Sequence, residues 1–266
     1  MSPRRRALLL CCAAVLAILA VVVALRLRPA HPVSTTSAVA QDRPGPVLMG
    51  PGYGGSTAAL EVLAGKLRAN GRSARVVVLP GDGTGDLREA ARALDVAARA
   101  AVASGAPSVD VVGYSAGGVT ARFWARHLGG ALIARRIITL GSPHHGSQVA
   151  ALGSAFAPGA CPTACEQLVP GSALLRDLNR GDETPAGPQW LALWTDQDAV
   201  VTPPGSAGLA GAVDVVLQTV CPGVSVSHAD LPRSALVTGL VLRAVETGPL
   251  LRAQASDCAS LTAAGG

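Results

Sequence analysis

The stretch Val109-Asp-Val-Val-Gly-Tyr-Ser-Ala-Gly-Gly-Val119 contains the most informative local pattern in the chain. A short apolar run leads into Gly113-Tyr-Ser-Ala-Gly117, and a helix-compatible segment follows. Gly-x-Ser-x-Gly between a strand and a helix is typical of a strained turn that projects its serine, with glycines leaving room for the neighbouring strand and helix. Although five residues also match by chance in ordinary turns, this context predicts that Ser115 is a nucleophile.

The rest of the chain predicts the sheet that such a turn requires. β-type apolar runs alternate with segments of helical composition, which indicates a parallel sheet of about six strands with helices on both faces, an α/β class. Residues 141–189 are rich in Gly, Pro, Ser and Cys and too long for an ordinary connection, so we expect a lid or one wall of a site there. The expected strands are 47–49, 76–79, 109–112, 137–140, 190–194 and 213–217, and the expected helices are 57–69, 86–103, 116–128 and 234–245.

The amino-terminal segment predicts export. Residues 7–25 are apolar throughout and long enough to cross a bilayer as a helix, which favours an uncleaved anchor over a shorter signal peptide. Ala38-Val-Ala40 is a small-x-small site that a signal peptidase accepts, so cleavage stays open. Flanking arginines place the amino terminus in the cytoplasm. We therefore expect an anchor or signal peptide at 1–28, a linker at 29–45 and an extracytoplasmic catalytic domain at 46–266.

The net charge of +5 comes from the amino-terminal segment. Five of the 22 basic residues lie in the first forty residues, which leaves 17 basic and 17 acidic residues in the exported part. Nucleic-acid binding requires a basic patch on the folded domain, so no nucleic-acid partner is expected. The exported part is long enough for one α/β domain with a sizeable core, and we expect a monomer.

Four cysteines lie outside the apolar segment: Cys161, Cys165, Cys221 and Cys258. An even number in an exported chain suggests two disulfides, and four cysteines allow three connectivities. We favour Cys161 with Cys165 and Cys221 with Cys258. A zinc site has little support, because no second pair or histidine follows at metal-ligand spacing. We expect neither a metal nor a cofactor.

A nucleophilic serine needs a histidine that takes its proton and a carboxylate that orients the histidine. In the fold that carries this turn, the acid follows a later strand and the histidine comes last. Of the five histidines, His228 alone follows the last expected strand, whereas the others are His31, His127, His144 and His145. For the acid we favour Asp198 over Asp196, and Asp230 is too close in sequence to His228 to orient it easily.

The oxyanion of an acyl-transfer reaction needs two hydrogen-bond donors. The backbone N–H of Ala116, at the start of the helix after Ser115, is the first. We assign the second to the N–H of Tyr53 in the turn Gly50-Pro-Gly-Tyr-Gly-Gly55, which follows the first strand. A nucleotide-binding interpretation of this turn fails, because no Lys-Ser/Thr follows and the dinucleotide spacing is incomplete.

Taken together, these motifs resemble exported bacterial lipases and esterases of the α/β-hydrolase superfamily, of the actinobacterial type. The resemblance extends over most of residues 46–245, and after the Ser115 turn its most specific element is Leu140-Gly-Ser-Pro-His-His-Gly-Ser147. It implies the α/β-hydrolase fold and ester hydrolysis with Ser115, Asp198 and His228 as triad and the amides of Tyr53 and Ala116 as oxyanion hole. One departure is Pro51-Gly52, where such lipases usually have His-Gly before the oxyanion residue.

The expected substrate is a small-molecule carboxylic ester or lipid. We expect Leu, Val, Ala and a few rings such as Tyr53 and Tyr114 to line an apolar pocket without a fixed cation, which suits an uncharged acyl chain. The alternatives are an acyltransferase on the same fold, a peptidase, and a non-catalytic binding protein tethered to the membrane. Since every expected triad residue is present, the non-catalytic alternative is disfavoured.

Overall fold

Six parallel strands form one sheet in the computed structural model, which describes residues 39–156, 159 and 161–266. The strands are β1 (Val47–Gly50), β2 (Ala74–Val76), β3 (Val109–Tyr114), β4 (Ala134–Leu140), β5 (Gln189–Trp194) and β6 (Val213–Val216). Their order across the sheet is β2-β1-β3-β4-β5-β6, and every neighbouring pair is parallel. The prediction of a parallel sheet of about six strands is confirmed.

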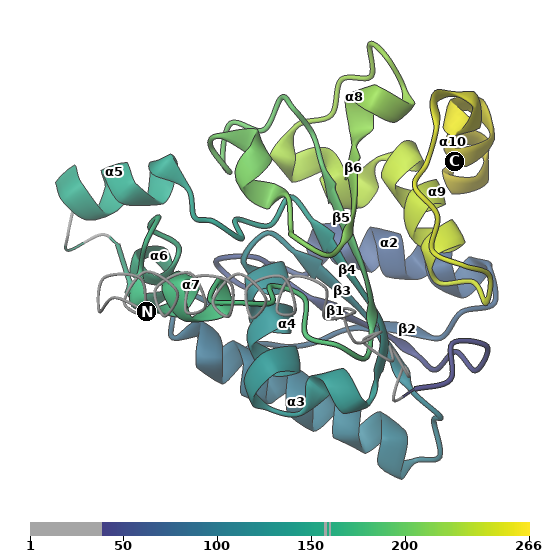
Figure 1. The fold of residues 1–266 in the computed structure, drawn as a ribbon, viewed down its shortest axis with the longest axis horizontal. Helices are drawn as coiled ribbons and strands as arrows, with labels where there is room; N and C mark the ends of the chain where they lie inside the picture. The colour runs from purple at the N-terminus through teal and green to yellow at the C-terminus, as the bar shows by residue number, and fades with distance from the viewer. Residues whose placement is uncertain (1–38, 157–158, 160) are drawn as a thin grey trace, which may run out of the picture. The chain divides into compact units, whose positions relative to one another are not determined.

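Helices cover both faces of this sheet because the side chains of each strand alternate between two cores (Figure 1). In β5, Leu191 and Leu193 pack with α2 (Ala58–Ala69) and α9 (Ala235–Ala244). The alternate residues of β5 pack with α3 (Leu87–Ala103) and α4 (Ala116–His127). The sheet is therefore buried on both sides, as the long apolar runs of its central strands require.

Shorter elements fill the connections. Between β4 and β5 lie α5 (Gln148–Phe156), α6 (Thr163–Gln167) and α7 (Ala173–Leu178), and α6 and α7 pack against the start of α4. The carboxyl-terminal α10 (Cys258–Gly265) packs on α9. The remaining elements are η1 (Gly130–Leu132), η3 (Pro204–Ala207), α8 (Leu217–Val220), η4 (His228–Arg233) and η5 (Ala255–Asp257).

Several elements differ from the sequence prediction, among them α5, α6, α7 and α8, which were not expected as helices. Strand β2 begins and ends earlier than expected, because its ladder partner β1 pairs with Ala74 to Val76 only, and Val78 is exposed instead of packed. Helix α10 was not predicted, since the helix expected near the end of the chain is α9. Its sequence, Cys258-Ala-Ser-Leu-Thr-Ala-Ala-Gly265, is short and only weakly amphipathic, so its helicity depends on packing against α9.

A buried ionic cluster stabilises the amino-terminal edge of the sheet. The carboxylate of Asp110 is fully buried and accepts bonds from Arg135 Nε at 2.9 Å, Arg135 Nη2 at 2.6 Å and Arg72 Nη2 at 2.9 Å. Arg135 also donates to the carbonyl oxygens of Val245 and Glu246, just after α9. Each charge therefore has partners, and the cluster joins β3 and β4 to the end of a helix that covers them.

Residues 39–45 belong to the expected linker, and their described contacts are with the domain. Val39 is buried, Arg135 Nη1 donates to the Gln41 carbonyl at 3.0 Å, and the Ser108 hydroxyl donates to the Arg43 carbonyl at 2.9 Å. The expected anchor at 1–28 and the first part of the linker lie outside the described residues. Within the described ranges, no helix combines the length and the apolarity that a membrane span needs.

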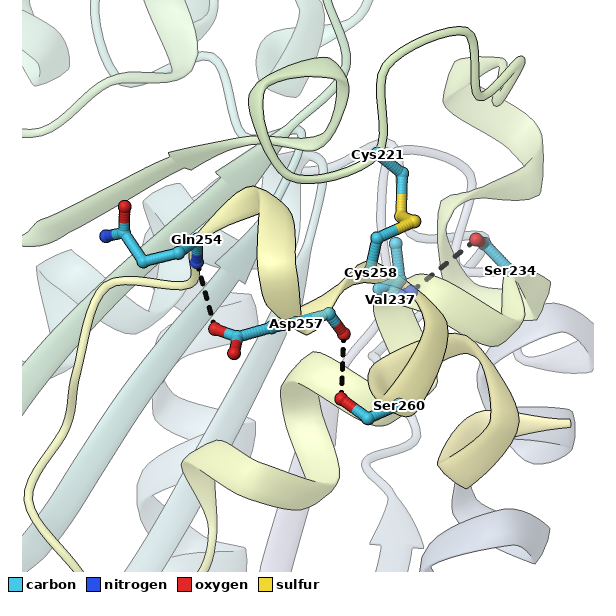
Figure 2. The surroundings of a disulfide bond; sticks show 7 residues. All are labelled: Cys221, Ser234, Val237, Gln254, Asp257, Cys258 and Ser260. Carbon is cyan, nitrogen blue, oxygen red and sulfur yellow. Dashed lines mark hydrogen bonds between the residues drawn. A yellow bond between two sulfur atoms is a disulfide. The ribbon is translucent and has the colours of Figure 1, made fainter.

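The two disulfides are those favoured from the sequence: Cys161–Cys165 and Cys221–Cys258. Figure 2 shows that the second joins Cys221, the residue directly after α8, to Cys258, the first residue of α10. Close by, Asp257 accepts a bond from the Gln254 backbone N–H at 2.9 Å, and the Ser260 hydroxyl donates to the Asp257 carbonyl at 2.9 Å (Figure 2). The bridge thus anchors the carboxyl-terminal helix to the part of the chain that precedes His228.

Because the stabilisation by a disulfide increases with the length of the loop that it closes, the two bridges should differ in effect. Replacing both Cys221 and Cys258 by Ser, which opens a separation of 37 residues, should lower the free energy of unfolding by about 4 kcal/mol. Replacing both Cys161 and Cys165, which are four residues apart, should lower it by about 2 kcal/mol. Denaturant unfolding of both variants measures this difference, and an equal loss would contradict the prediction.

Candidate active site

Ser115 sits in a strained turn between β3 and α4. Its φ of 52° and ψ of −124° are unfavourable for a residue with a side chain, and no other described non-glycine residue has a positive φ. The turn is fixed by a bond from the Ser115 backbone N–H to the Leu140 carbonyl at 2.8 Å. This is the geometry that the Gly-x-Ser-x-Gly pattern predicts.

The glycines on either side allow α4 to approach the sheet closely. An added Cβ at Gly117 would lie 2.2 Å from the Gly50 carbonyl oxygen of β1, and one at Gly113 would lie 2.5 Å from the Gly118 Cα. Real Cβ atoms do not tolerate such contacts, because both obstacles are backbone atoms. Both glycines therefore leave room for the neighbouring strand and helix, as expected from the sequence.

Asp198 and His228 lie together at the carboxyl end of the sheet. His228 Nδ1 is 2.7 Å from Asp198 Oδ2, and both side chains are almost completely buried. The other carboxylate oxygen of Asp198 accepts the backbone N–H groups of Val200 at 2.9 Å and Val201 at 2.8 Å. The carboxylate is thus held by three donors, and the bond at Nδ1 leaves His228 Nε2 available for another group.

The two other candidate acids lie elsewhere. Asp196 is exposed, and its backbone N–H donates to the Gln218 side chain at 3.1 Å. Asp230 accepts a bond from the Ser227 hydroxyl at 2.5 Å. Of the carboxylates considered from the sequence, the structure brings Asp198 to His228.

Tyr114 connects Ser115 with His228. The rings of Tyr114 and His228 lie 5.2 Å apart, and the Tyr114 hydroxyl donates to the His228 carbonyl at 3.1 Å. Burial, with a smaller effect of the Asp198 charge, raises the pKa of Tyr114 to about 12, so this hydroxyl stays protonated and keeps donating. The residue next to the serine therefore holds the histidine loop in place.

The Ser115 hydroxyl makes no hydrogen bond to His228 or to any other residue that the structure describes. Catalytic hydrogen bonds are often long without substrate and tighten in the complex. The Ser115 backbone N–H nevertheless bonds to Leu140, and the next residue, Gly141, lies beside the pair. A Cβ built on Gly141 would be 3.2 Å from both Asp198 Oδ2 and His228 Nδ1. The Ser115 turn and the Asp198–His228 pair therefore both lie at the end of β4.

The loop after β1 lies over Ser115. A Cβ built on Gly52 would be 3.0 Å from Ser115 Cβ, so the loop is at van der Waals distance from the serine. The loop is fixed by a bond from the Gly54 N–H to the Gly83 carbonyl at 3.2 Å. Within the described residues, the amides of Tyr53 and Ala116 have no hydrogen-bond acceptor. Both expected oxyanion donors are therefore free to bind a ligand despite the Pro51-Gly52 departure.

The histidines that were set aside have other partners. His127 Nε2 lies 2.7 Å from Asp177, and His145 Nε2 lies 2.9 Å from Glu183. His144 is fully buried, with Nε2 3.1 Å from the Thr139 hydroxyl and Nδ1 without a partner. Burial, helped by nearby cationic groups, lowers the pKa of His144 well below its ordinary value, so its ring is neutral. His31 lies outside the described residues.

A cavity of about 310 Å³ opens beside Ser115. Its walls come from the loops after β1 and β5 and from residues within 141–189, the segment expected to form a lid or a wall; movement as a lid stays a prediction. Tyr53 lines the cavity as expected, whereas Tyr114 faces His228 instead. The lining residues are Tyr53, Ser115, Pro143, Ser147, Val149, Ala150, Gly153, Cys165, Leu168, Val200 and Val201, none of them charged.

Two contacts at this site were missed by the sequence analysis. The middle position of Gly-Tyr-Ser carries no signal that Tyr114 would pack against a histidine more than a hundred residues later. Nor does the sequence show that Gln218, after β6, bonds to the loop that carries Asp198. In the described part of the chain, no group of three or more His, Cys, Asp or Glu side chains is arranged to hold a metal ion.

Comparison with solved structures identifies the fold. The mature form of the Bacillus licheniformis lipase BlEst2 superimposes with a TM-score of 0.62 at 19% identity, covering 76% of this chain and 92% of that one. Aspergillus fumigatus lipase B gives 0.62 at 17% identity, covering 88% of this chain and 64% of that one. Phospholipase PlaB from Legionella pneumophila gives 0.56 at 17% identity, covering 82% of this chain and 61% of that one. The fold is that of an α/β-hydrolase.

Sequence comparison points to lipases among the α/β-hydrolases. A family model described as Lipase (class 2) matches residues 91–212, slightly less than half of the chain. The match includes the Ser115 turn and the loop of Asp198 and ends before His228. A search of curated proteins finds no match. The chain spans less than two thirds of the Aspergillus and Legionella proteins.

The close approach at Gly117 predicts that a Gly-to-Ala substitution changes stability in opposite directions at two helical positions, Gly117 and Gly65. Gly117→Ala should destabilise the protein by about 3 kcal/mol, because its new Cβ collides with the backbone of β1. Gly65→Ala in α2 is the control: its Cβ would meet only the flexible end of Arg68 at 3.9 Å, so the better helix propensity of Ala should stabilise by up to about 1 kcal/mol. Thermal and denaturant unfolding measure both, and a neutral Gly117→Ala would contradict the close approach.

Proposed function

We propose that this protein is an extracytoplasmic serine hydrolase that cleaves the carboxylic esters of lipids through a triad of Ser115, Asp198 and His228. The observation that carries the proposal is the buried Asp198–His228 pair at the same edge of the sheet as the strained Ser115 turn. Strain of this kind is costly, and it persists where the surrounding structure holds a side chain in a required position. The class 2 lipase match over residues 91–212 supports the same reaction.

In the proposed mechanism His228 acts first as a base. Its Nε2 takes the proton of the Ser115 hydroxyl while the serine oxygen attacks the ester carbonyl, and Asp198 steadies the resulting imidazolium through Nδ1. The amides of Tyr53 and Ala116 donate to the tetrahedral oxyanion. His228 then protonates the leaving alcohol, and water releases the acid from Ser115 by the same steps.

The cavity beside Ser115 supports an acyl chain as the part of the substrate that is bound. No lining side chain is charged, so nothing in the wall would pair with an ionic substrate. Apolar lining with a few polar groups at the reacting end is the usual composition of a site for an uncharged ligand. We therefore propose a lipid or another acyl ester as substrate.

The surface around the mouth of the cavity supports a lipid aggregate as the source of that substrate. Helix α5 has no charged residue and no buried residue, and Leu152 and Phe156 are 57% and 83% exposed. Val149 of α5, Val200 and Tyr53 add exposed apolar area beside the cavity. Such a patch is unfavourable in water and gains stability when it contacts lipid.

The proposed location rests on the amino-terminal sequence and on the two disulfides. Disulfides persist in oxidising compartments outside the cytoplasm. We propose that residues 7–25 either anchor the domain in the membrane or are removed as a signal, and that the domain acts as a monomer. The apolar segment itself lies outside the described residues.

The triad predicts which acid is essential. In residues 39–266, Ser115→Ala should abolish both labelling by a fluorophosphonate probe and hydrolysis of p-nitrophenyl esters. Asp198→Asn should lower kcat by about a thousandfold or more, because His228 loses the carboxylate that orients it. Asp196→Asn is the matched control and should leave kcat close to that of the parent, since its side chain is exposed. Loss at Asp196 and not at Asp198 would refute the assignment.

The α5 surface predicts a dependence on the physical state of the substrate. Leu152→Ser should reduce hydrolysis of long-chain esters presented in vesicles while leaving a dissolved short-chain p-nitrophenyl ester unaffected, because only the vesicle contacts α5. Val96→Ser is the control, since Val96 is even more exposed than Leu152 but lies on α3. If both variants lose activity on both substrates to the same extent, α5 does not contact lipid.

A further inference from the structure

Gln218 makes three side-chain hydrogen bonds beside the candidate active site. It is the second residue of α8, the short helix directly after β6. Its Nε2 donates to the Thr195 hydroxyl oxygen at 2.9 Å and to the Val224 carbonyl at 3.3 Å. Its Oε1 accepts the Asp196 backbone N–H at 3.1 Å. Both the nitrogen and the oxygen of the Gln218 side-chain amide therefore make hydrogen bonds.

These partners belong to the two loops that carry Asp198 and His228. Thr195 and Asp196 begin the loop after β5, and the Asp198 N–H donates to the Thr195 carbonyl at 3.3 Å. Val224 lies four residues before His228, in the loop that follows Cys221. A single side chain thus bonds to the start of the acid loop and to the segment that leads into the histidine.

Gln218 is itself held firmly. Its neighbours Leu217 and Val220 are fully buried, and the Cys221 N–H donates to the Leu217 carbonyl at 2.9 Å. The disulfide to Cys258 then fixes the end of α8 to the carboxyl-terminal helix (Figure 2). Because α8 is anchored on both sides, its glutamine is a fixed point between these two loops, which also meet through the Asp198–His228 pair and a bond from Gln197 to the Val224 carbonyl.

We propose that Gln218 is a positioning residue that sets the alignment of Asp198 with His228 by bonding both of their loops to α8. This inference rests on the proposed function, since alignment of the pair matters only if His228 transfers protons. Asp198 and His228 are in bonding contact at 2.7 Å, and small displacements of a reacting group cost much of the rate. Gln218 contacts the acid loop at two adjacent points, the Thr195 hydroxyl and the Asp196 N–H. Two points of contact restrict the rotation of the loop as well as its distance from α8.

The chain offers a matched control in Gln197. Its Nε2 also donates to the Val224 carbonyl, at 3.4 Å, but this is the only bond of that side chain among the described residues, and Gln197 is exposed. A single exposed bond of that length contributes little. The two glutamines therefore share one acceptor and differ in the bonds to Thr195 and Asp196.

The experiment compares Gln218→Leu, Gln218→Glu and Gln197→Leu in the full-length chain. With a soluble p-nitrophenyl ester, Gln218→Leu should lower kcat about tenfold and leave KM unchanged, because no residue of this bridge lines the cavity. The rate of fluorophosphonate labelling of Ser115 should fall in proportion. Gln218→Glu keeps the acceptor for the Asp196 N–H and loses the donors, so its kcat should lie between those of Gln218→Leu and the parent. Gln197→Leu should retain the kcat of the parent.

The outcomes separate this inference from the proposed function. If the parent chain neither hydrolyses the ester nor labels at Ser115, the proposed function fails. If the parent is active and kcat is unchanged in both Gln218 variants, or falls equally in Gln197→Leu, the positioning role is refuted. A rise in KM with constant kcat would also refute it, since that would place Gln218 in substrate binding. If thermal unfolding shows that Gln218→Leu does not fold, the near-isosteric Gln218→Glu decides between these results.

Discussion

The close approach of α4 to β1 and β3 is the constraint on which the candidate site depends. Backbone meets backbone at Gly113 and Gly117, and the chain has to turn from strand to helix within a few residues. That turn forces Ser115 into a positive φ and projects its side chain from the carboxyl edge of the sheet. A larger residue at either glycine would push α4 away from the sheet. The chain could then turn from strand to helix without the positive φ at Ser115.

The same edge gathers the other parts of the site, because parallel strands all end there. Strand β4 ends there with Leu140 and is followed by Gly141, the loop after β5 contributes Asp198, and the segment after α8 contributes His228. The loops are held by side chains of their neighbours: Tyr114 bonds the histidine loop, and Gln218 bonds both loops. On the cavity side the contacts are apolar and α5 is exposed. Neither Tyr114 nor Gln218 lines this cavity, and no residue of its lining is charged.

Much of this could be predicted from the sequence because it depends on local patterns. The alternation of apolar runs with helical segments gives the sheet, and the glycines around Ser115 give the turn. The choice of His228 followed from its place after the last strand, and the structure brings it to Asp198. The disulfide pairing favoured from the sequence is the one observed.

The rest depends on contacts between distant residues, for which the sequence holds no signal. Helix α10 forms against α9 and has little helical pattern of its own. Strand β2 ends at Val76, the last residue that pairs with β1, although Val77 to Leu79 continue an apolar run. Tyr114 was expected in the wall of the pocket and packs on His228 instead, because its side chain lies on the face of the sheet that α2 and α9 cover. The spacing of apolar residues shows which face of a helix or strand is buried, but it does not show which distant residue that face contacts.

The most direct test of the account is a crystal structure of the domain after reaction with an alkyl phosphonate ester. The account predicts phosphorus bonded to Ser115 Oγ, the phosphoryl oxygen within hydrogen-bond distance of the Tyr53 and Ala116 amides, His228 Nε2 facing the serine oxygen, and the alkyl group in the cavity beside α5. Phosphorus on another residue, or His228 turned away from the modified serine, would contradict it.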